Sequence, residues 1–487
     1  MLFWRVKPLD LILETAEKKA LKRTLGAFQL TMLGIGAIIG TGIFVLTAEA
    51  ATKAGPAMMI SFVIAAFVCG VAALCYAEMA AMVPVSGSAY TYSYATMGEL
   101  VAWVVGWALV LEYAIAASAV SVGWSGYMVG LVREIFGVTL PHALVAGPFD
   151  RVPGMINLPA MGIALLVTWL LVIGTRESAR FNSVLVAIKL AALLLFIFLA
   201  VPAIRAENFE PFMPNGFFAR TVVDPITGSL VTVGVAAAAA SIFFAYVGFD
   251  AVSTAAEETI NPQRNLPIGL IGSLSICTLI YLVVAAAATG SVGAQPGGEL
   301  AQSREALAYV LRAIGHGWAG DLVAIAAGLA LPSVILMMLY GQTRIFFVMS
   351  RDGLLPEVFS RLHSRYGTPH VVTLTTGVFV AFFAALFPVG ALADISNSGT
   401  LFAFFTVAVG VMILRRTQPT RERHFRTPAV WVIAPLAALG CVFLFFQLSG
   451  YTELMFFGWA AIGLLLYAFY GRRRSHLAPR GLAQPAQ

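Results

Sequence analysis

The sequence predicts an all-α polytopic membrane protein with about 12 transmembrane helices, most of them arranged as two inverted repeats of five helices. The chain of 487 residues is 60% hydrophobic and only 11% charged, with a mean hydropathy of +0.88. Its apolar residues gather in about 12 stretches that are long enough to cross a bilayer. Two of these stretches, five spans apart, are interrupted by glycine and polar residues, which is the observation that indicates a repeat.

The spans follow a charged N-terminal arm, residues 1–25, which lacks the apolar centre of a cleavable signal peptide. The predicted spans are 26–48, 57–82, 98–130, 157–175, 178–203, 232–256, 267–290, 319–350, 371–387, 391–414, 428–448 and 453–471. Residues 26–203 would form the first repeat and residues 232–414 the second. A peripheral pair of helices at 428–471 and a tail at 472–487 complete the chain.

The first span contains a crowded group of glycines where a plain membrane helix would have leucine or valine. These are Gly34, Gly36, Gly40 and Gly42. Each glycine in a helix interior costs about 1 kcal/mol relative to alanine, so the group predicts an unwound segment. Helix packing through glycine needs only one spaced pair, which makes it the weaker explanation. Freed amides at Thr41 and Gly42 could bind an anion, and the carbonyls from Gly36 to Ile38 a cation, a combination that suits an α-amino acid.

The sixth span repeats this arrangement, with Gly248, Asp250 and Ser253 inside an apolar stretch. Irregular backbone at membrane depth is tolerated where it lines a cavity or a ligand. Corresponding interruptions in two halves therefore point to a transporter that binds its substrate at the midplane between the two broken helices.

The fifth span carries Lys189, about eleven residues from either end and hence roughly 16 Å deep. An ionisable group at this depth is expensive, so a functional role is the first interpretation. Burial favours the neutral amine, which would let Lys189 act as a proton carrier. A fixed structural cation is the alternative.

Lysine and arginine concentrate in the N-terminal arm, in the loop from Arg415 to Arg426 and in the tail from Arg472. The positive-inside rule places these segments in the cytoplasm, so both termini are predicted to be cytoplasmic in a multi-pass protein of the cell membrane. The same bias accounts for the net charge of +6, and we do not predict nucleic-acid binding.

The sequence contains no nucleotide-binding loop, no Ser/His/Asp set and no cluster with metal-ligand spacing. All four cysteines fall within predicted spans, which argues against a disulfide framework. We therefore predict no enzymatic activity, no cofactor and no metal.

Four ordered motifs resemble the amino acid, polyamine and organocation (APC) superfamily of transporters, and within it the cationic amino acid transporter family. They are GIGAIIGTGIF (34–44), YAEMAAMVPVSGSAYTY (76–92), EETINPQRNLP (257–267) and GQTRIFFVMSRDGLLP (341–356). The resemblance covers nearly the whole chain and implies a LeuT-like fold, in which the broken first and sixth helices bind the substrate.

Carried over to this chain, the resemblance places the substrate carboxylate at the amides of Thr41 and Gly42. The ammonium would meet the carbonyls near Ile38, Phe243 and Tyr246. The resemblance also adds Gly40, Ala245 and Asp250 to the expected substrate site. Phe243 resembles an aromatic gate over the substrate, although an aromatic residue in a helix interface is an equal alternative.

In proton-dependent members of the family, an ammonium at the position that Lys189 resembles takes the place of a sodium ion. We therefore expect Lys189 near the carbonyls of Gly34 to Gly36. The intramembrane carboxylates Glu112 and Asp250 could contact a cationic substrate, or pair with Lys189 or with each other. Met337 could shape the side-chain pocket or simply fill core or lipid-facing space.

The function predicted is secondary active transport of an amino acid, with proton-coupled symport by alternating access. A sodium-independent exchanger and a non-transporting amino acid receptor are the alternatives. The family name suggests a cationic substrate, whereas the deep Lys189 favours neutral or broad specificity. The expected partners are the amino acid, a proton and membrane lipid; an accessory subunit is not predicted either way.

Overall fold

The computed structural model describes residues 5–10, 12, 23–85, 87–174, 179–223 and 230–477. Most of the predicted N-terminal arm and the tail beyond residue 477 therefore lie outside the described residues.

The described residues form a helical membrane protein, as predicted. Eight of their helical segments are long and apolar enough to cross a membrane: Leu46–Met82, Glu99–Phe136, Phe181–Ala203, Val235–Thr254, Pro262–Val292, Gly317–Arg351, Val389–Thr417 and Gly450–Arg474. Four shorter apolar helices in the same described part are α2 (Ala27–Ile38), α9 (Leu158–Ile173), α17 (His370–Leu386) and α19 (Val430–Phe445). Every predicted stretch thus contains a helix, while the number of membrane crossings stays a prediction.

The long segments contain the helices α4 (Leu46–Ala54), α5 (Met58–Met82), α7 (Glu99–Phe136), α10 (Ala179–Ala200), α11 (Val235–Ile242), α12 (Ala251–Thr254), α13 (Pro262–Val292), α16 (Gly317–Arg351), α18 (Val389–Thr417), α20 (Gly450–Leu466) and α21 (Arg472–Arg474). Shorter helices connect them: α3 (Thr41–Phe44), α6 (Ser88–Thr96), α8 (His142–Val145), α14 (Glu299–Gln302) and α15 (Ala306–Ala313). The sequence did not predict α6, α14 or α15 as separate helices.

Local chemistry sets several helix ends. The helix α7 ends at Gly137, where φ is +65° and ψ is +13°, a left-handed conformation that glycine adopts without a steric penalty. The helix α9 begins after Asn157, whose side-chain oxygen accepts a hydrogen bond from the Ala160 amide at 3.2 Å. These ends keep α7 and α9 separate although both are strongly apolar.

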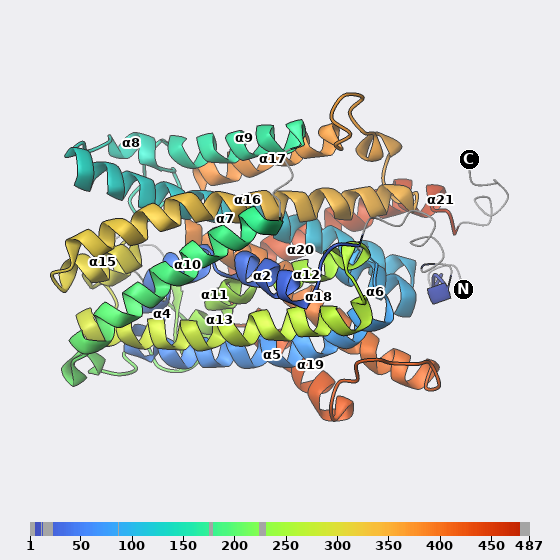
Figure 1. Ribbon diagram of the computed structural model, residues 1–487, viewed down its shortest axis with the longest axis horizontal. Coiled ribbons are helices and arrows are strands. Elements are labelled where there is room, and N and C mark those ends of the chain that lie inside the picture. The colour runs from blue at the N-terminus through green and yellow to red at the C-terminus, as the bar shows by residue number, and fades with distance from the viewer. Residues whose placement is uncertain are drawn as a thin grey trace.

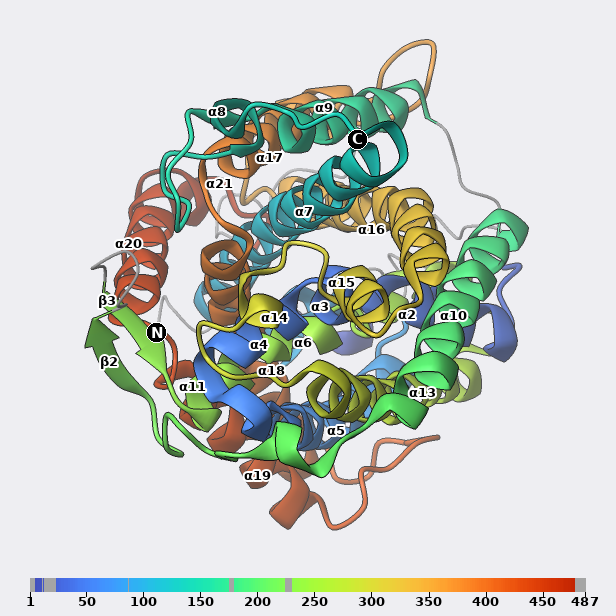
Figure 2. The same cartoon turned by 90° about the vertical axis from the view of Figure 1, so that its left-hand side faces the viewer.

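The long helices run along the longest axis of the molecule (Figure 1). Helices α6 and α21 lie toward one end of this axis, and α4 and α15 lie toward the other (Figure 1). Seen end-on, α2, α3 and α4 lie in the middle, with α5, α7, α10, α13 and α16 around them, and α11 packs beside α4 and α5 (Figure 2). The segments that the sequence predicts to be interrupted therefore form the centre of the fold.

The C-terminal helix α20 is attached to α7 by reciprocal tryptophan contacts. The Trp107 indole donates to the Trp459 carbonyl at 2.9 Å, and the Trp459 indole donates to the Trp107 carbonyl at 2.8 Å. Their rings stack with centroids 4.5 Å apart. Because lipid gives helices little hydrophobic reason to associate, such bonds and close packing hold a peripheral helix in place.

A two-stranded antiparallel sheet interrupts the all-helical pattern and was not predicted. Strand β2 (Arg220–Val223) pairs with β3 (Leu230–Val233), with Arg220 opposite Val233. The hairpin leads directly into α11 through Gly234, whose amide donates to the Lys53 carbonyl at 2.9 Å. A further two-residue strand, β1 (Ile156–Asn157), precedes α9.

Candidate substrate site at the interrupted helices

The first span is interrupted where its glycines are most crowded. Helix α2 ends at Ile38 and α3 begins at Thr41, which leaves Ile39 and Gly40 outside helical structure. Gly40 has φ of −150° and ψ of −146°, an extended conformation. Thr41 is almost fully buried, and its hydroxyl has no hydrogen-bond partner among the described residues. The predicted break is thus confirmed, and it lies in the interior.

The sixth span is interrupted in the same way. Helix α11 ends at Ile242, a 3-10 turn covers Phe243–Tyr246, and α12 begins only at Ala251. Gly248 has φ of +115°, a conformation that L side chains rarely adopt. This glycine therefore permits the change of chain direction between the two half-helices.

The two interruptions touch each other through backbone that carries no bulky side chain. A Cβ atom added to Gly42 would lie 2.2 Å from the Ala245 Cα atom, and one added to Gly248 would lie 3.0 Å from the Ala37 carbonyl carbon. Two of the glycines are thus needed for close approach, and they bring the predicted residues Thr41, Gly42 and Ala245 together.

Lys189 contacts the first interrupted helix as predicted. Its ammonium donates to the Gly36 carbonyl at 2.7 Å, and the residue is only 1% exposed. Gly36 also packs closely against α10, since an added Cβ would lie 3.0 Å from the Asn182 side-chain oxygen and 3.0 Å from a Val186 methyl group. The position of Lys189 is therefore established, while its role in proton transfer stays a prediction.

Two tyrosines that sequence reasoning missed hold other carbonyls of the first span. The Tyr281 hydroxyl donates to the Ile38 carbonyl at 2.8 Å, and the Tyr127 hydroxyl donates to the Phe44 carbonyl at 2.7 Å. The predicted ammonium ligand at Ile38 is thus already hydrogen-bonded, so a substrate would have to share this oxygen with Tyr281 or displace its hydroxyl. No sequence signal distinguished these tyrosines from ordinary core residues.

Asp250 belongs to the interruption of the sixth span and does not pair with Lys189. Its carboxylate accepts from the Tyr113 hydroxyl at 2.9 Å and from the Gly248 amide at 3.2 Å. The residue is completely buried. Asp250 thereby stabilises the unwound segment from within, and Tyr113 connects it to α7.

Comparison with known proteins agrees with this architecture. Residues 25–469 match the amino acid permease family over nearly the whole chain. The chain belongs to this family. The family and its curated relatives are transporters and not enzymes, and amino acid transport is the activity that they support.

Two bacterial relatives match the permease along almost their entire length. The branched-chain amino acid permease BcaP of Bacillus subtilis is 47% identical over 471 residues, which cover 96% of this chain and 97% of the relative. The methylthioribose transporter of the same organism is 42% identical over 475 residues, or 97% and 99% of the two chains. Human cationic amino acid transporter 4 is 36% identical over 420 residues, or 84% and 62%.

Glu112 lies beside the same region of the permease without the predicted partner. The residue is completely buried, and neither carboxylate oxygen makes a hydrogen bond within the described part of the chain. The Thr400 hydroxyl lies beside this carboxylate and donates to the Ser396 carbonyl at 3.2 Å. No hydrogen bond joins Glu112 to Lys189 or Asp250 among the described residues, although the Glu112 carboxyl is close enough to Asp250 to interact with it electrostatically.

The remaining predicted residues surround the interruptions with apolar groups. Phe243 and Ala245 are completely buried, and the Phe243 ring packs edge-on against Phe404 with centroids 5.8 Å apart. Met337 is only half-buried. Its neighbour Val334, which was not predicted, lies against Gly40, where an added Cβ would be 3.4 Å away. Val334 is thus the nearest neighbour of the position that a Gly40 side chain would occupy.

The Tyr246 side chain makes its hydrogen bond to α5 and not to the first break. Its hydroxyl donates to the Phe62 carbonyl at 3.2 Å, and its ring lies 5.5 Å from that of Tyr281. Only the Tyr246 backbone therefore belongs to the predicted ligand set.

A buried ion pair joins the broken helices at the end that carries α4. The Lys53 ammonium donates to the Asp394 carboxylate at 2.9 Å and to the Ser241 hydroxyl at 2.5 Å. Ser241 in turn donates to the second Asp394 oxygen, and Glu49 lies 3.5 Å from the ammonium. The Asn397 amide adds bonds to two carbonyls at the end of α11. These contacts tie α4, α11 and α18 together.

The helices α14 and α15 cover this end of the molecule, in front of α3 and α4 (Figure 2). The Thr52 hydroxyl donates to the Ala301 carbonyl at 3.1 Å, and the Leu307 amide donates to the Tyr127 hydroxyl at 3.4 Å. Glu305, the residue before α15, ties the cover to the end of α7, because its carboxylate lies 3.4 Å from the Arg133 guanidinium. Burial raises the pKa of the Glu305 carboxyl above its ordinary value. The candidate site is therefore covered on this side.

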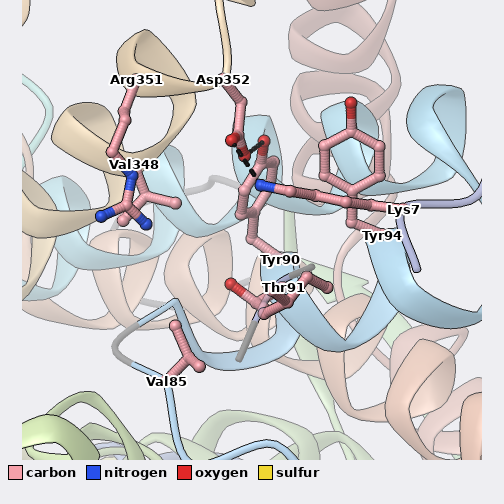
Figure 3. A pocket seen from close by; sticks show the side chains of 9 residues that line it. Lys7, Val85, Tyr90, Thr91, Tyr94, Val348, Arg351 and Asp352 are labelled. Carbon is pink, nitrogen blue, oxygen red and sulfur yellow. Dashed lines mark hydrogen bonds and ion pairs between the residues drawn. The ribbon is translucent and has the colours of Figure 1, made fainter. Parts of the chain in front are cut away.

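A small cavity lies elsewhere, toward the end that carries α6 and α21. Lys7, Tyr90, Thr91, Tyr94, Arg351 and Asp352 are among the residues that line it (Figure 3). It does not coincide with the predicted substrate site. No group of His, Cys, Asp or Glu side chains that could hold a metal occurs in the described ranges.

Proposed function

We propose that this permease is a proton-coupled amino acid symporter that works by alternating access. Its 12 predicted membrane helices would form the LeuT-like arrangement of two inverted five-helix repeats and a peripheral pair. The observation that carries this proposal is the meeting of two interrupted helices in a buried site, with the Lys189 ammonium on the Gly36 carbonyl. Irregular backbone at such depth is expected where it serves a ligand.

The backbone of the two interruptions supplies the head-group ligands in this proposal. The amides of Thr41 and Gly42 at the start of α3 would bind the substrate carboxylate, because a helix start carries a partial positive charge. Carbonyls of Ile38, Phe243 and Tyr246 would bind the ammonium, with Gly40, Ala245 and Asp250 shaping the surrounding backbone. In this proposal Asp250 does not touch the substrate. It stabilises the unwound backbone by accepting a hydrogen bond from the Gly248 amide.

We infer that the substrate side chain is neutral and apolar. Val334 and Phe243 offer apolar contacts near the interruptions, and the Lys189 ammonium would oppose a second cation. The 47% identical relative carries the name of a branched-chain amino acid permease, which supports the same choice. Glu112 and Met337 are the residues that would have to rearrange to accept a cationic side chain.

Lys189 would couple protons to the transport cycle. Its protonated form keeps the Gly36 carbonyl satisfied and so holds α2 in the observed position. Loss of the proton would remove a charge-assisted hydrogen bond, worth about 1.5–3 kcal/mol, and would release α2 toward another state. In the competing exchanger, Lys189 would remain charged throughout.

A second substrate class has support from one comparison. The methylthioribose transporter that is 42% identical to this chain carries a thioether-bearing sugar in its name. The head-group ligands proposed above require both a carboxylate and an ammonium, which that compound lacks. We therefore rank methylthioribose after the amino acids as a substrate. A non-transporting receptor likewise ranks after transport as a function.

The test is uptake into sodium-free proteoliposomes, with and without an inside-alkaline pH gradient. The labelled panel contains leucine, isoleucine, valine, alanine, arginine and methylthioribose. We expect accumulation of the aliphatic amino acids, and we expect Lys189→Met to reduce gradient-driven accumulation by at least about tenfold, the equivalent of 1.4 kcal/mol.

Three other results would contradict the proposal. Uptake that appears only in liposomes preloaded with amino acid would indicate an exchanger. Arginine or methylthioribose as the only substrate would refute the neutral amino acid assignment. Full gradient-driven accumulation by the Lys189→Met variant would show that this lysine does not carry the proton.

A further inference from the structure

The connection between α18 and α19 concentrates positive charge at the rim of the molecule. Residues 415–426, here called the basic loop, contain five arginines and one glutamate. The loop joins the ends of two apolar helices, and its Arg421 pairs with Asp10 of the N-terminal segment at 3.0 Å. Helix α19 lies at the outer edge, beyond α5 (Figure 2). The basic loop therefore lies beside the surface that α19 presents to lipid.

A buried carboxylate on α5 fixes the conformation of the basic loop. Glu78 accepts from the Arg415 guanidinium at 2.7 and 2.8 Å, and from the Thr427 amide at 2.8 Å. The Arg423 guanidinium lies 3.2 Å from the same carboxylate and is almost fully buried. One carboxylate thus serves two guanidinium groups, and these contacts hold the loop against α5 and α18.

Two further arginines of the basic loop have no acidic partner. Arg416 and Arg426 are exposed, and neither makes an ion pair or a hydrogen bond with any residue that the structure describes. Desolvation lowers the pKa of the Arg423 guanidinium below its ordinary value despite the nearby carboxylate, and the like charges of Arg415 and Arg426 act in the same direction. Positive charge is therefore in excess here, and an anion would relieve the repulsion.

An aromatic ring and an apolar helix face adjoin these arginines. The Arg416 guanidinium lies over the ring of Trp431, the second residue of α19, at 5.0 Å from the centroid. Val432, Leu436 and Leu439 are exposed and recur at helical spacing, so they form one apolar face of α19. Tryptophan and arginine above such a face are typical of the boundary between lipid and water. A guanidinium stacked on a ring keeps its N–H edge available to a phosphate.

We propose that Arg416, Arg426 and Trp431 form a binding site for the headgroup of an anionic phospholipid. The two guanidinium groups donate to the phosphate oxygens, which their planar donor geometry matches. The acyl chains lie along the apolar face of α19, and this face favours a lipid over a soluble anion or an acidic protein. The bound lipid supplies the negative charge that the basic loop lacks. This inference goes beyond the proposed function and holds for a symporter and an exchanger alike.

The test compares phosphatidylglycerol with phosphatidylcholine of identical acyl chains. Each lipid is titrated into purified full-length protein in detergent, and bound lipid is counted by native mass spectrometry. The variant is Arg416→Gln/Arg426→Gln, which alters only exposed side chains. We expect the unmodified protein to prefer phosphatidylglycerol by at least about tenfold and the variant by less than about twofold, because each basic residue near an anionic surface favours binding by about fivefold.

Two controls separate this site from charge in general and from free anions. Arg361→Gln/Arg365→Gln removes the same charge from the loop that follows α16, where Arg365 also lies over an aromatic ring, that of Tyr366, at 5.5 Å. This variant should keep the full preference for phosphatidylglycerol. Glycerol 3-phosphate, a soluble anion without acyl chains, should displace the lipid only weakly.

A second measurement locates the bound lipid. Phosphatidylglycerol with brominated acyl chains quenches the fluorescence of a nearby indole, and the difference between the unmodified protein and Trp431→Phe isolates the signal of Trp431. We expect this signal to be quenched at lower concentrations of brominated phosphatidylglycerol than of brominated phosphatidylcholine, and the difference to disappear in the Arg416→Gln/Arg426→Gln variant.

Four results overturn the inference. These are equal binding of the two lipids by the unmodified protein, an unchanged preference in the Arg416→Gln/Arg426→Gln variant, an equal loss in the Arg361→Gln/Arg365→Gln control, and binding of glycerol 3-phosphate as tight as that of the lipid. The single variants Arg416→Gln and Arg426→Gln take the place of the double variant if it fails to insert. Amino acid uptake does not enter the test, so a failure of the proposed function would leave its outcome unchanged.

Discussion

At Gly42 the two interrupted helices approach more closely than any side chain would allow. A Cβ atom at this position would lie 2.2 Å from the Ala245 Cα atom and 2.5 Å from its Cβ atom. Both partners belong to rigid, fully buried backbone, so neither can move aside cheaply. The missing side chain at Gly42 is therefore part of the site and not simply a source of flexibility.

We expect Gly42→Ala to reduce amino acid uptake by at least about tenfold, because overpacking of 1–3 kcal/mol would separate the predicted carboxylate and ammonium ligands. The matched control is Gly70→Ala on α5, where an added Cβ would meet nothing within 4 Å. For both variants, uptake measures activity, and the elution profile in size-exclusion chromatography measures folding. Near-normal uptake by the Gly42 variant would show that this contact is dispensable.

At this scale the sequence identifies residues that are out of place in an apolar span. Lys189 and Asp250 stand out because charge is rare at membrane depth, and Gly42 because glycine weakens a helix. Tyr281 and Val334 could not be predicted, because each is an ordinary core residue whose role depends on which distant backbone it meets. The ligand-binding role of all these residues stays a prediction.

Among the elements, α4, α11 and α18 are linked by the most concentrated polar cluster near the site. The Lys53 and Asp394 side chains are 10% and 7% exposed, and their ion pair has Ser241 as an additional partner. Removing one member of such a pair leaves an uncompensated buried charge, which typically costs about 3–5 kcal/mol. We therefore expect the pair to resist separation of these three helices.

Lys53→Met and Asp394→Asn should each lower the unfolding temperature by several degrees, and the double variant should lose much less than the sum of the two. The unfolding temperatures of the four proteins are measured in detergent by a thermal unfolding assay. Together they form a double-mutant cycle. Arg205→Ala is the matched control, because its ion pair with Glu207 is 74% and 75% exposed. Additive effects of the Lys53 and Asp394 changes would mean that the pair is not coupled.

The helices themselves were predictable to different degrees. Composition alone predicts long apolar helices such as α7 and α16. Their predicted limits agree with the structure within a few residues at most ends. Helix α6, Ser-Ala-Tyr-Thr-Tyr-Ser-Tyr-Ala-Thr, could not be predicted, because serine, threonine and tyrosine favour no helix and its stability comes from packing against α7 and α18. The hairpin of β2 and β3 was missed because both strands are only four residues long.

For the whole molecule, the charge pattern predicts an orientation. Residues 5–10 contact Tyr94 and Glu99, and residues 475–476 contact Glu99 and Asp352, so the first and last described segments lie on one side. The basic residues of the α18–α19 loop lie there as well, since Arg421 pairs with Asp10 at 3.0 Å. The positive-inside rule then predicts that this side is cytoplasmic.

A fluorescent protein fused after residue 487 should therefore fold and emit in living bacteria, while alkaline phosphatase inserted near Gly216 should be active. The insertion site lies in the loop ahead of the hairpin, between the exposed residues Met213 and Phe217, at the end away from α21. The exchanged fusions, with phosphatase at the C-terminus and fluorescent protein at Gly216, provide the control. An active C-terminal phosphatase would reverse the predicted orientation.

The contact between Gly42 and Ala245 also has a genetic consequence. Because the absent side chain of one position accommodates the backbone of the other, the residues permitted at either site depend on the residue present at its partner. The same holds for Gly248 and Ala37. The two halves of the permease, although far apart in the gene, are therefore constrained to evolve as linked pairs at these points.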